Sequence, residues 1–242
     1  MNTKLKLLAT LCLALILGGE ASAQIGVRRD RLSIGGSAGM SFSSIDFEPT
    51  IKQKQLMCPT VGLTVRYACE KYFSTVCAIQ GEVNLVKMGW KEEILSGSGE
   101  PLPDTYQREL TYVQIPLLAR MSWGGERRGA MFFVMAGPQF SIFLNDKAKQ
   151  SDEWTLTVGA IPDRPNNVVQ QYDLEIQRKV DYGLTAGMGM EVNTAIGHFN
   201  IEGRYYLGLN DIYNNSKKDP FSRSAHRTIL AKITYLFDLF DR

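Results

Sequence analysis

One stretch of alternating side chains, from Lys179 to Leu209, most limits what this chain can fold into. Between Tyr182 and Val192 every second residue is apolar, and the residues between them are mostly glycine or polar. The alternation resumes at Phe199 after a short segment, 194–197, that contains glycine. A period of two residues is typical of a β-strand whose two faces meet different surroundings. Two such runs around a short glycine-containing segment therefore predict an antiparallel hairpin.

The same alternation recurs along the chain and predicts eight strands. Each run is close to the roughly ten residues that a tilted strand needs to cross a bilayer. The predicted strands are Ser33–Ser43, Thr60–Cys69, Thr75–Met88, Tyr106–Trp123, Ala130–Leu144, the two strands of the central hairpin, and Arg227–Phe237. An even number of strands suits a closed bacterial barrel.

The connections between these strands alternate in length. The short ones are 70–74, 124–129 and 194–197, and the long ones are 44–59, 89–105, 145–178 and 211–226. Short periplasmic turns and long outer loops are typical of outer-membrane barrels, with both ends of the chain in the periplasm. The polar faces are mostly Gly, Ser, Thr, Gln and Asn, which suits a crowded interior better than a solvated exterior. We therefore expect an all-β, eight-stranded, antiparallel transmembrane up-and-down β-barrel whose apolar face meets lipid.

The N-terminal segment has the three parts of a secretory signal peptide. Lys4 and Lys6 precede an apolar run, Leu7–Leu17, and Ala21–Ala23 supplies small residues in an A-x-A pattern. The run is shorter than the roughly 20 residues that a membrane helix needs. We expect residues 1–23 to be a signal peptide cut between Ala23 and Gln24, followed by one barrel domain, 24–242.

Composition agrees with an exported membrane protein. The formal net charge is only +2, which gives no reason to expect a nucleic-acid partner. The expected location is the outer membrane of a Gram-negative bacterium. The expected partners are outer-membrane lipid and the barrel-assembly machinery, and the sequence does not identify an envelope protein or a surface ligand.

The inward-facing positions of the predicted strands carry charges of both signs. These are Arg66, Glu82, Arg120, Glu191, Glu202, Arg204 and Lys232. Charges that are shut away from water must pair or be hydrated. A four-residue turn in the hairpin sets Gly189 opposite Glu202 and Gly187 opposite Arg204, and an analogous register puts Arg66 diagonal to Glu82. Eight strands leave an interior just wide enough for side chains to fill, so we predict a plugged lumen that does not conduct.

Aromatic residues fall near the predicted strand ends and predict two girdles at the membrane interfaces. The predicted outer girdle consists of Trp90, Tyr106, Tyr182 and Phe42. Trp123, Phe199, Tyr235 and Phe237 belong to the predicted periplasmic girdle. Tyr235 and Phe237 are also the expected assembly signal, with the last five residues as a tail.

Two further features concern the strands themselves. Cys69 and Cys77 flank a predicted turn and share a strand face, so they form either a disulfide or two unpaired small side chains near the rim. Pro116 and Pro138 fall inside predicted strands, where proline removes a ladder hydrogen bond. We expect local bulges at both prolines.

The sequence carries no established catalytic or cofactor motif. It has no H-E-x-x-H zinc motif and no phosphate-binding loop. His226 has Ser222, Ser224 and Asp219 near it in the chain. Residues that are adjacent in a loop are weak evidence for a hydrolase or acyltransferase, because such sites are defined by geometry. We expect no enzymatic activity, no cofactor and no metal.

Three stretches resemble a known family. Tyr112–Leu118, Ala136–Phe140 and Arg204–Leu209 are similar to the PorT-like outer-membrane β-barrel domain of Gram-negative bacteria. The resemblance spans most of the mature chain and implies the barrel fold. The namesake of that family acts in type IX protein secretion, which implies a possible role in export or envelope assembly.

Two function classes therefore stand ahead of an enzyme: a structural or binding barrel that displays loops at the cell surface, and an accessory component of an export or assembly machine. The loop 145–178 is the expected binding surface. Its apolar residues Trp154, Leu156 and Val158, and later Tyr172, Leu174 and Ile176, continue the strand alternation. Turn-forming residues at 161–167 separate the two sets, so we predict a hairpin ribbon there.

Overall fold

The computed structural model describes residues 26–95, 100–126, 128–151, 157–158, 161–162, 171–172 and 174–241. The predicted signal peptide, 1–23, and its cleavage between Ala23 and Gln24 lie outside these residues. Among the residues described, no helix is long and apolar enough to cross a membrane.

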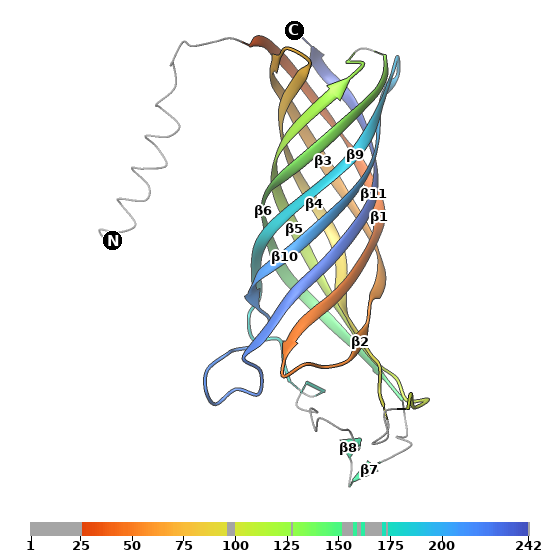
Figure 1. Ribbon diagram of the computed structural model, residues 1–242, viewed down its shortest axis with the longest axis vertical. Coiled ribbons are helices and arrows are strands. Elements are labelled where there is room, and N and C mark those ends of the chain that lie inside the picture. The colour runs from red at the N-terminus through yellow and green to blue at the C-terminus, as the bar shows by residue number, and fades with distance from the viewer. Residues whose placement is uncertain are drawn as a thin grey trace, which may run out of the picture.

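Eight long antiparallel strands dominate the structure (Figure 1). They are β1 (Val27–Glu48), β3 (Leu56–Tyr72), β4 (Thr75–Glu92), β5 (Tyr106–Gly124), β6 (Gly129–Gln150), β9 (Val180–Thr194), β10 (Gly197–Asp211) and β11 (Arg223–Asp241). Three short strands of two residues accompany them: β2 (Gln53–Lys54), β7 (Thr157–Val158) and β8 (Ile161–Pro162). The prediction of an all-β antiparallel fold is confirmed, and most strands run several residues beyond their predicted ends.

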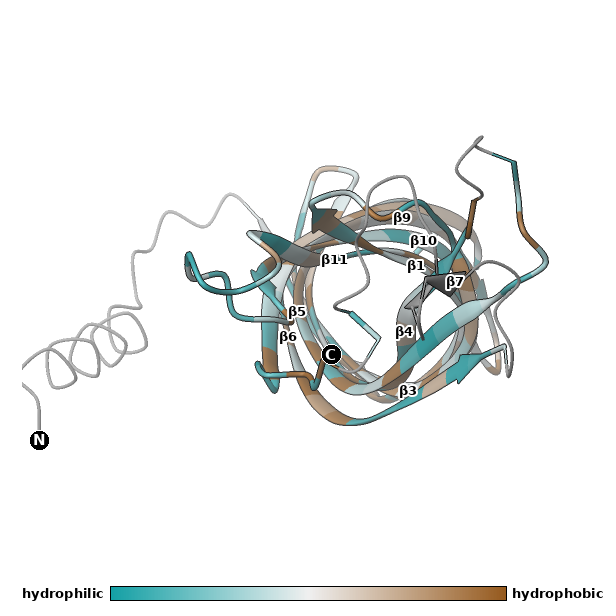
Figure 2. Ribbon diagram, turned by 90° about the horizontal axis from the view of Figure 1, so that it is seen from below, coloured by the Kyte–Doolittle hydropathy of each residue, from teal (hydrophilic) through white to brown (hydrophobic). Residues whose placement is uncertain are grey.

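The main sheet returns to its own beginning. Its nine strands follow the order β2-β4-β3-β1-β11-β10-β9-β6-β5, and β4 is also hydrogen-bonded to β5. Each long strand therefore pairs with two neighbours, and the ribbon encloses a cylinder (Figures 1 and 2). We call the end where β1 begins and β11 finishes the terminal end, at the top of Figure 1, and the opposite end the loop end.

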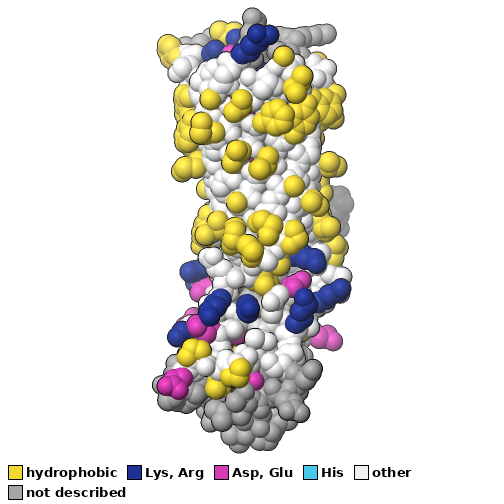
Figure 3. Space-filling model, turned by 90° about the vertical axis from the view of Figure 1, so that its right-hand side faces the viewer, with side chains coloured by type: hydrophobic (Ala, Val, Ile, Leu, Met, Phe, Trp, Pro, Cys, Tyr) yellow, Lys and Arg dark blue, Asp and Glu magenta, His cyan; other side chains and the backbone are white. Residues whose placement is uncertain are grey.

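The side chains of each strand alternate between the interior and the outer surface of the cylinder. On β10, Glu202, Arg204 and Tyr206 are buried, whereas Ile201 and Tyr205 are exposed. The same arrangement on the other strands places a band of apolar side chains around the outside, which Figure 3 shows in yellow. A water-soluble protein buries such side chains, so this surface is suited to an apolar environment.

The predicted bulges at Pro116 and Pro138 are wrong, because the strand register is unchanged at both prolines. The register between β4 and β5 is the same at Asn84↔Gln114 and at Gly81↔Leu117, on either side of Pro116. Pro138 keeps its place opposite Leu184. Each strand pairs on both sides, so a proline can omit its missing N–H from one ladder while the other holds the register. The irregularity between β5 and β6 lies instead between Thr111 and Tyr112.

Of the two alternatives for Cys69 and Cys77, the structure has the unpaired thiols and not the disulfide, because both cysteines are free. The register between β3 and β4 shifts between Ala68 and Glu70, so Cys77 faces Glu70 instead of Cys69. A bulge of this kind adds one residue to one strand and removes the cross-strand position that a disulfide requires.

The predicted ribbon in the loop 145–178 is also corrected where the structure describes it. Trp154 and Leu156 lie outside the described residues, and Val158 belongs to the short β7–β8 pair. The end of β6, up to Gln150, pairs with β5 and not with β9. Residues 174–179 form no strand, and Ile176 is buried. This side of the loop therefore turns inward instead of extending the hairpin.

The bulge at Cys69 predicts that both thiols stay reduced in the folded protein under air. Purification of the mature chain without reductant, followed by unfolding and alkylation, should add a label to Cys69 and to Cys77. Mass spectrometry of the peptides measures this. A Cys69–Cys77 crosslinked peptide as the main product would contradict the register.

Candidate functional site

Two buried clusters of ion pairs cross the interior of the cylinder. The first cluster joins Arg66 on β3 and Arg120 on β5 to a single carboxylate, that of Glu191 on β9. The Cζ atom of Arg120 also lies 3.6 Å from the centroid of the Phe133 ring. One carboxylate thus links three strands that do not pair with one another, and a cation–π contact holds one of the arginines in place.

The second cluster centres on Glu82 of β4. Arg204 donates to both of its carboxylate oxygens, at 2.9 and 2.5 Å, and Lys232 donates to one of them at 2.6 Å. Glu202 lies 2.7 Å from Arg204 and 3.3 Å from Lys232. Two cations and two carboxylates from β4, β10 and β11 therefore neutralise one another, and the bidentate arginine fixes their geometry.

Two glycines on β9 make room for these side chains. Gly187 lies opposite Arg204 and Gly189 opposite Glu202, in the register expected from the sequence. A Cβ atom on Gly187 would lie 2.7 Å from Cγ of Arg204, which is too close for an unstrained contact. Arg66 stands diagonal to Glu82 in the ladder but pairs with Glu191, because Glu82 is already bound by Arg204 and Lys232.

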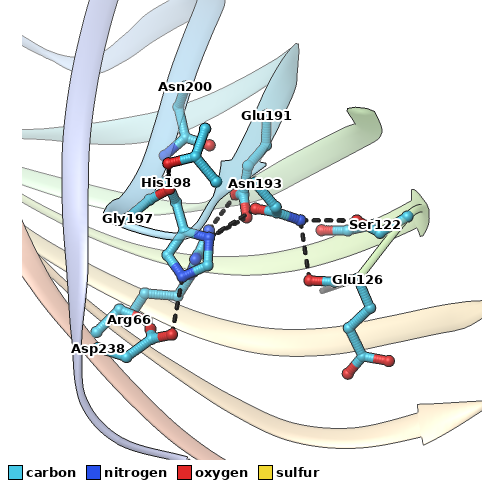
Figure 4. A network of polar contacts seen from close by, with 12 residues as sticks. Arg66, Ser122, Glu126, Glu191, Asn193, Gly197, His198, Asn200 and Asp238 are labelled. Atoms are coloured by element: carbon cyan, nitrogen blue, oxygen red, sulfur yellow. Dashed lines mark hydrogen bonds and ion pairs between the residues drawn. The ribbon is translucent and has the colours of Figure 1, made fainter. Parts of the chain in front are cut away.

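A polar network lies at the terminal end (Figure 4). The ring nitrogens of His198 lie 2.6 Å from Oδ1 of Asn193 and 2.9 Å from Oδ2 of Asp238. The amide of Asn193 donates to the carbonyls of Gly125 and Glu126, at 2.9 and 3.1 Å. The turn between β5 and β6 is therefore tied to the interior, and His198 has a structural place in that network.

The carboxylate of Glu126, which belongs to the same turn, binds two cations on neighbouring strands. It accepts hydrogen bonds from Arg29 at 2.9 Å and from Lys71 at 2.8 Å. Burial acts to raise the pKa of Glu126, but these two hydrogen bonds outweigh it and hold that pKa below its usual value. Glu126 is thus charged at neutral pH and binds the two cations.

A second kind of interior, an aromatic cap, fills the loop end. We define this cap as the buried cluster Ile45, Phe47, Ile51, Val86, Met88, Trp90, Ile94, Tyr106, Leu110, Tyr112, Ile176, Ile212, Tyr213 and Phe221. Its rings are in contact: Phe47 and Trp90 have centroids 5.2 Å apart, and Tyr213 and Phe221 have centroids 5.6 Å apart. Apolar and aromatic side chains are therefore closely packed inside the loop end.

Two buried charged residues attach the loop after β6 to the aromatic cap. Arg108 donates to Asp146 at 2.7 Å, to the carbonyl of Leu174 at 2.7 Å and to the hydroxyl of Tyr213 at 3.2 Å. Burial raises the pKa of Tyr213, which keeps its hydroxyl protonated. Glu92 accepts hydrogen bonds from Trp90, at 3.2 Å, and from Tyr172, at 3.1 Å. The root of this loop is therefore fixed over the opening.

The placement of Trp90 and Tyr106 corrects the predicted outer girdle, because both side chains belong to the buried aromatic cap. Trp90 is fully buried in the aromatic cap, because it shares the inward face of β4 with Glu82 and Asn84. The signal was present in the sequence, since residues an even number apart on a strand share one face. The other girdle residues lie on the outside: Tyr182, Phe199, Tyr235 and Phe237 are exposed, and Trp123 is partly exposed and stacks on Phe132.

The residues considered for hydrolase chemistry have other partners. His226 is buried, and its Nε2 lies 3.1 Å from the hydroxyl of Tyr112. The hydroxyl of Ser224 accepts from the backbone N–H of Tyr213, and Asp219 accepts from Ser216. Within the described part of the chain, no group of three or more His, Cys, Asp or Glu residues is arranged to hold a metal ion.

Comparisons with known proteins give one family match and several structural similarities. The family model described as outer membrane protein beta-barrel domain matches residues 22–214. No curated protein matches the chain by sequence. Three similar solved structures are the N-terminal β-barrel domain of Pseudomonas aeruginosa OprF, P. aeruginosa OprG, and Yersinia pestis Ail in complex with sucrose octasulfate.

These structures share little sequence with the chain. OprF is 11% identical with a TM-score of 0.37, covering 88% of this chain and 99% of its own. OprG is 11% identical with a TM-score of 0.43, covering 88% and 98%. Ail is 10% identical with a TM-score of 0.35, covering 86% and 99%.

The central place of Glu82 leads to a stability prediction. Glu82→Gln keeps the shape of the side chain but leaves Arg204 and Lys232 with one fewer carboxylate in a buried site. Removing one partner of a buried ion pair costs about 3–5 kcal/mol. We expect a loss of that order in the free energy of unfolding, measured by urea titration of the refolded protein.

Glu109→Gln is the matched control, because the cations that Glu109 meets are two exposed lysines, at 3.5 and 3.8 Å. Its other hydrogen bond comes from the neutral side chain of Gln107, at 2.8 Å. Surface ion pairs contribute at most about 1 kcal/mol. Equal losses in the free energy of unfolding for Glu82→Gln and Glu109→Gln would show that the interior ion pairs stabilise the fold no more than surface ion pairs do.

Proposed function

The chain belongs to the outer membrane protein beta-barrel domain family, and from that membership we propose that it is an integral barrel with a closed lumen that displays a structural or binding surface to the outside of the cell. The family places the protein in the outer membrane of a Gram-negative bacterium. The proposal adds three finer statements: the eight long strands span the bilayer, the lumen does not conduct, and the loop end carries the function.

The observation that carries the proposal is that the sheet exposes apolar side chains on its outer face and buries charged side chains on its inner face, the opposite of a water-soluble protein. Exposed apolar side chains form the outer band, while ion pairs fill the interior at the same height. On β10, for example, exposed Ile201 and Tyr205 flank buried Glu202 and Arg204 along the strand. Lipid tails outside and paired charges inside are the surroundings that satisfy both faces.

The two ends of the cylinder support an orientation. Phe199, Tyr235 and Phe237 are exposed at the terminal end, where the strand connections are short, as expected for the periplasmic interface. Both termini then lie in the periplasm, consistent with residues 1–23 being a signal peptide. The loop end faces outward in this orientation.

The attachment of the loops favours binding over conduction as the function of the outer end. Arg108 and Glu92 fix the loop after β6 against the aromatic cap, so this surface rests on a rigid support. Barrels commonly carry function on outer loops held by such a scaffold. The cap and the two ion-pair clusters together obstruct the path through the lumen.

A role in protein export remains the second candidate, and it rests on the resemblance to the PorT-like family. The three stretches that carry this resemblance, 112–118, 136–140 and 204–209, lie in β5, β6 and β10. They belong to strands and not to loops, so they support the barrel more than a particular partner. Crosslinking in whole cells and recovery of this chain with a secretion component would favour export. Our proposal includes no enzymatic activity, cofactor or metal.

The first test concerns membrane integration. After alkaline carbonate extraction of cells, we expect the mature protein in the outer-membrane pellet, because the apolar band must remain in lipid. Recovery as a soluble periplasmic protein would refute the proposed span.

The second test concerns the lumen. Refolded protein in planar bilayers should give no stable conductance, since paired charges and the aromatic cap fill the interior. Arg204→Ala removes one side chain from the Glu82 cluster, and Lys218→Ala, in the loop before β11, is the matched control for loss of a cation. Stable, charge-selective currents in the unmodified protein that change with Arg204→Ala but not with Lys218→Ala would show that the lumen is a channel.

A further inference from the structure

Cations are in excess on the outer surface where the apolar band meets the loop end. On β4, β5 and β6, Lys87 and Lys149 both approach the carboxylate of Glu109, at 3.8 and 3.5 Å. Their side chains are 46% and 71% exposed. One carboxylate neutralises one of two cations, so this group keeps a positive charge that faces away from the cylinder.

A second group of charged side chains lies on β1 and β11, where Glu48 also stands opposite Arg223 in the ladder. Arg223 and Arg227 lie 2.9 and 2.7 Å from the same oxygen of Asp46, and their side chains are 47% and 46% exposed. Each guanidinium carries five N–H donors, and Asp46 uses only a part of them. The remaining donors are available to an anion from outside. We call Lys87, Lys149, Arg223 and Arg227 the basic collar.

The basic collar borders the apolar band directly. Lys87 follows exposed Leu85 on the outward face of β4, and Arg227 precedes exposed Ile229 on the outward face of β11. Figure 3 shows Lys and Arg side chains, with some acidic ones, in a band beside the yellow surface at this end. A molecule that touches both zones must combine an apolar part with an anionic part.

We propose that the basic collar binds the phosphate groups of anionic lipids in the outer leaflet. The inference rests on the proposed membrane span, which brings the collar to the height of the headgroups. Lys and Arg both bind phosphate, and arginine does so in a bidentate manner. The acyl chains of the same lipid lie along the apolar band, and this shared contact favours a lipid over a soluble polyanion. Bound phosphate would also complete the neutralisation that Glu109 leaves unfinished between Lys87 and Lys149.

The test measures lipid binding to the folded mature protein in detergent by native mass spectrometry. The probes are diphosphorylated lipid A, the same lipid without its phosphates, and sucrose octasulfate as a soluble polyanion. We expect preference for the phosphorylated lipid. The double variants Lys87→Gln/Lys149→Gln and Arg223→Gln/Arg227→Gln should each weaken its binding by about tenfold.

Two further sets of variants make the result decisive. Lys217→Gln/Lys218→Gln removes two cations from the loop before β11 and should leave lipid binding unchanged. Glu109→Gln and Asp46→Asn remove the competing carboxylates and should strengthen binding, a gain that a folding defect cannot produce. Heat-modified migration in gels verifies that each variant is folded.

Three outcomes would overturn the proposal: equal binding of the lipid with and without phosphates, an equal loss in the control variant, or tighter binding of the soluble polyanion than of the lipid. Because binding is measured on folded protein in detergent, these outcomes leave the proposed membrane span untouched. Failure of carbonate extraction, in contrast, would refute that span without reference to lipid binding.

Discussion

The contact on which this structure depends most is the one between Glu82 and its two cations, Arg204 and Lys232. A sheet that closes on itself has an interior that water enters poorly, and charged groups there lose several kcal/mol of hydration each. Their mutual attraction offsets that loss only when geometry is good and the remaining donors and acceptors are satisfied. The bidentate contact from Arg204 supplies that geometry. Gly187 on β9 leaves space for the Arg204 side chain, because it has no side chain of its own. The strands that carry these residues are thereby held at fixed distances across the cylinder.

The interior is built from two layers with different chemistry. Ion pairs occupy the middle and terminal parts, where strands face one another directly. The aromatic cap occupies the loop end, where Arg108 and Glu92 also tie down the loop after β6. The first layer fixes the spacing of the strands, and the second packs the interior of the loop end. What the molecule offers to its surroundings is therefore its loop surface and its apolar exterior, and the proposed binding role is based on that arrangement.

Much of this fold follows from local alternation in the sequence, and the exceptions have physical causes. The period of two residues predicts the strands and the inward positions of residues such as Arg204, because it reflects the geometry of a single strand. The bulge at Cys69 could not be predicted, since it depends on how β3 and β4 pair. The partner of Arg66 depends on competition for Glu82 between residues far apart in the chain. Trp90 is different: its inward position was predictable from its spacing to Glu82, but its aromatic character suggested the interface.

The natural thiol of Cys58 gives the most direct measurement of whether the interior is closed. Cys58 is buried on β3, two residues nearer the loop end than Thr60, which pairs with Gly39 on one side and with Val86 of the aromatic cap on the other. Gly39 in turn pairs with Lys232, so Cys58 lies beyond the height of Lys232. The measurement uses the mature protein with Cys69→Ser and Cys77→Ser, reconstituted in vesicles and exposed to a charged, water-soluble thiol reagent. The account predicts that Cys58 stays unlabelled until the protein is unfolded. Rapid labelling of Cys58 in the folded protein would contradict it, because the reagent can reach that position only through an open lumen.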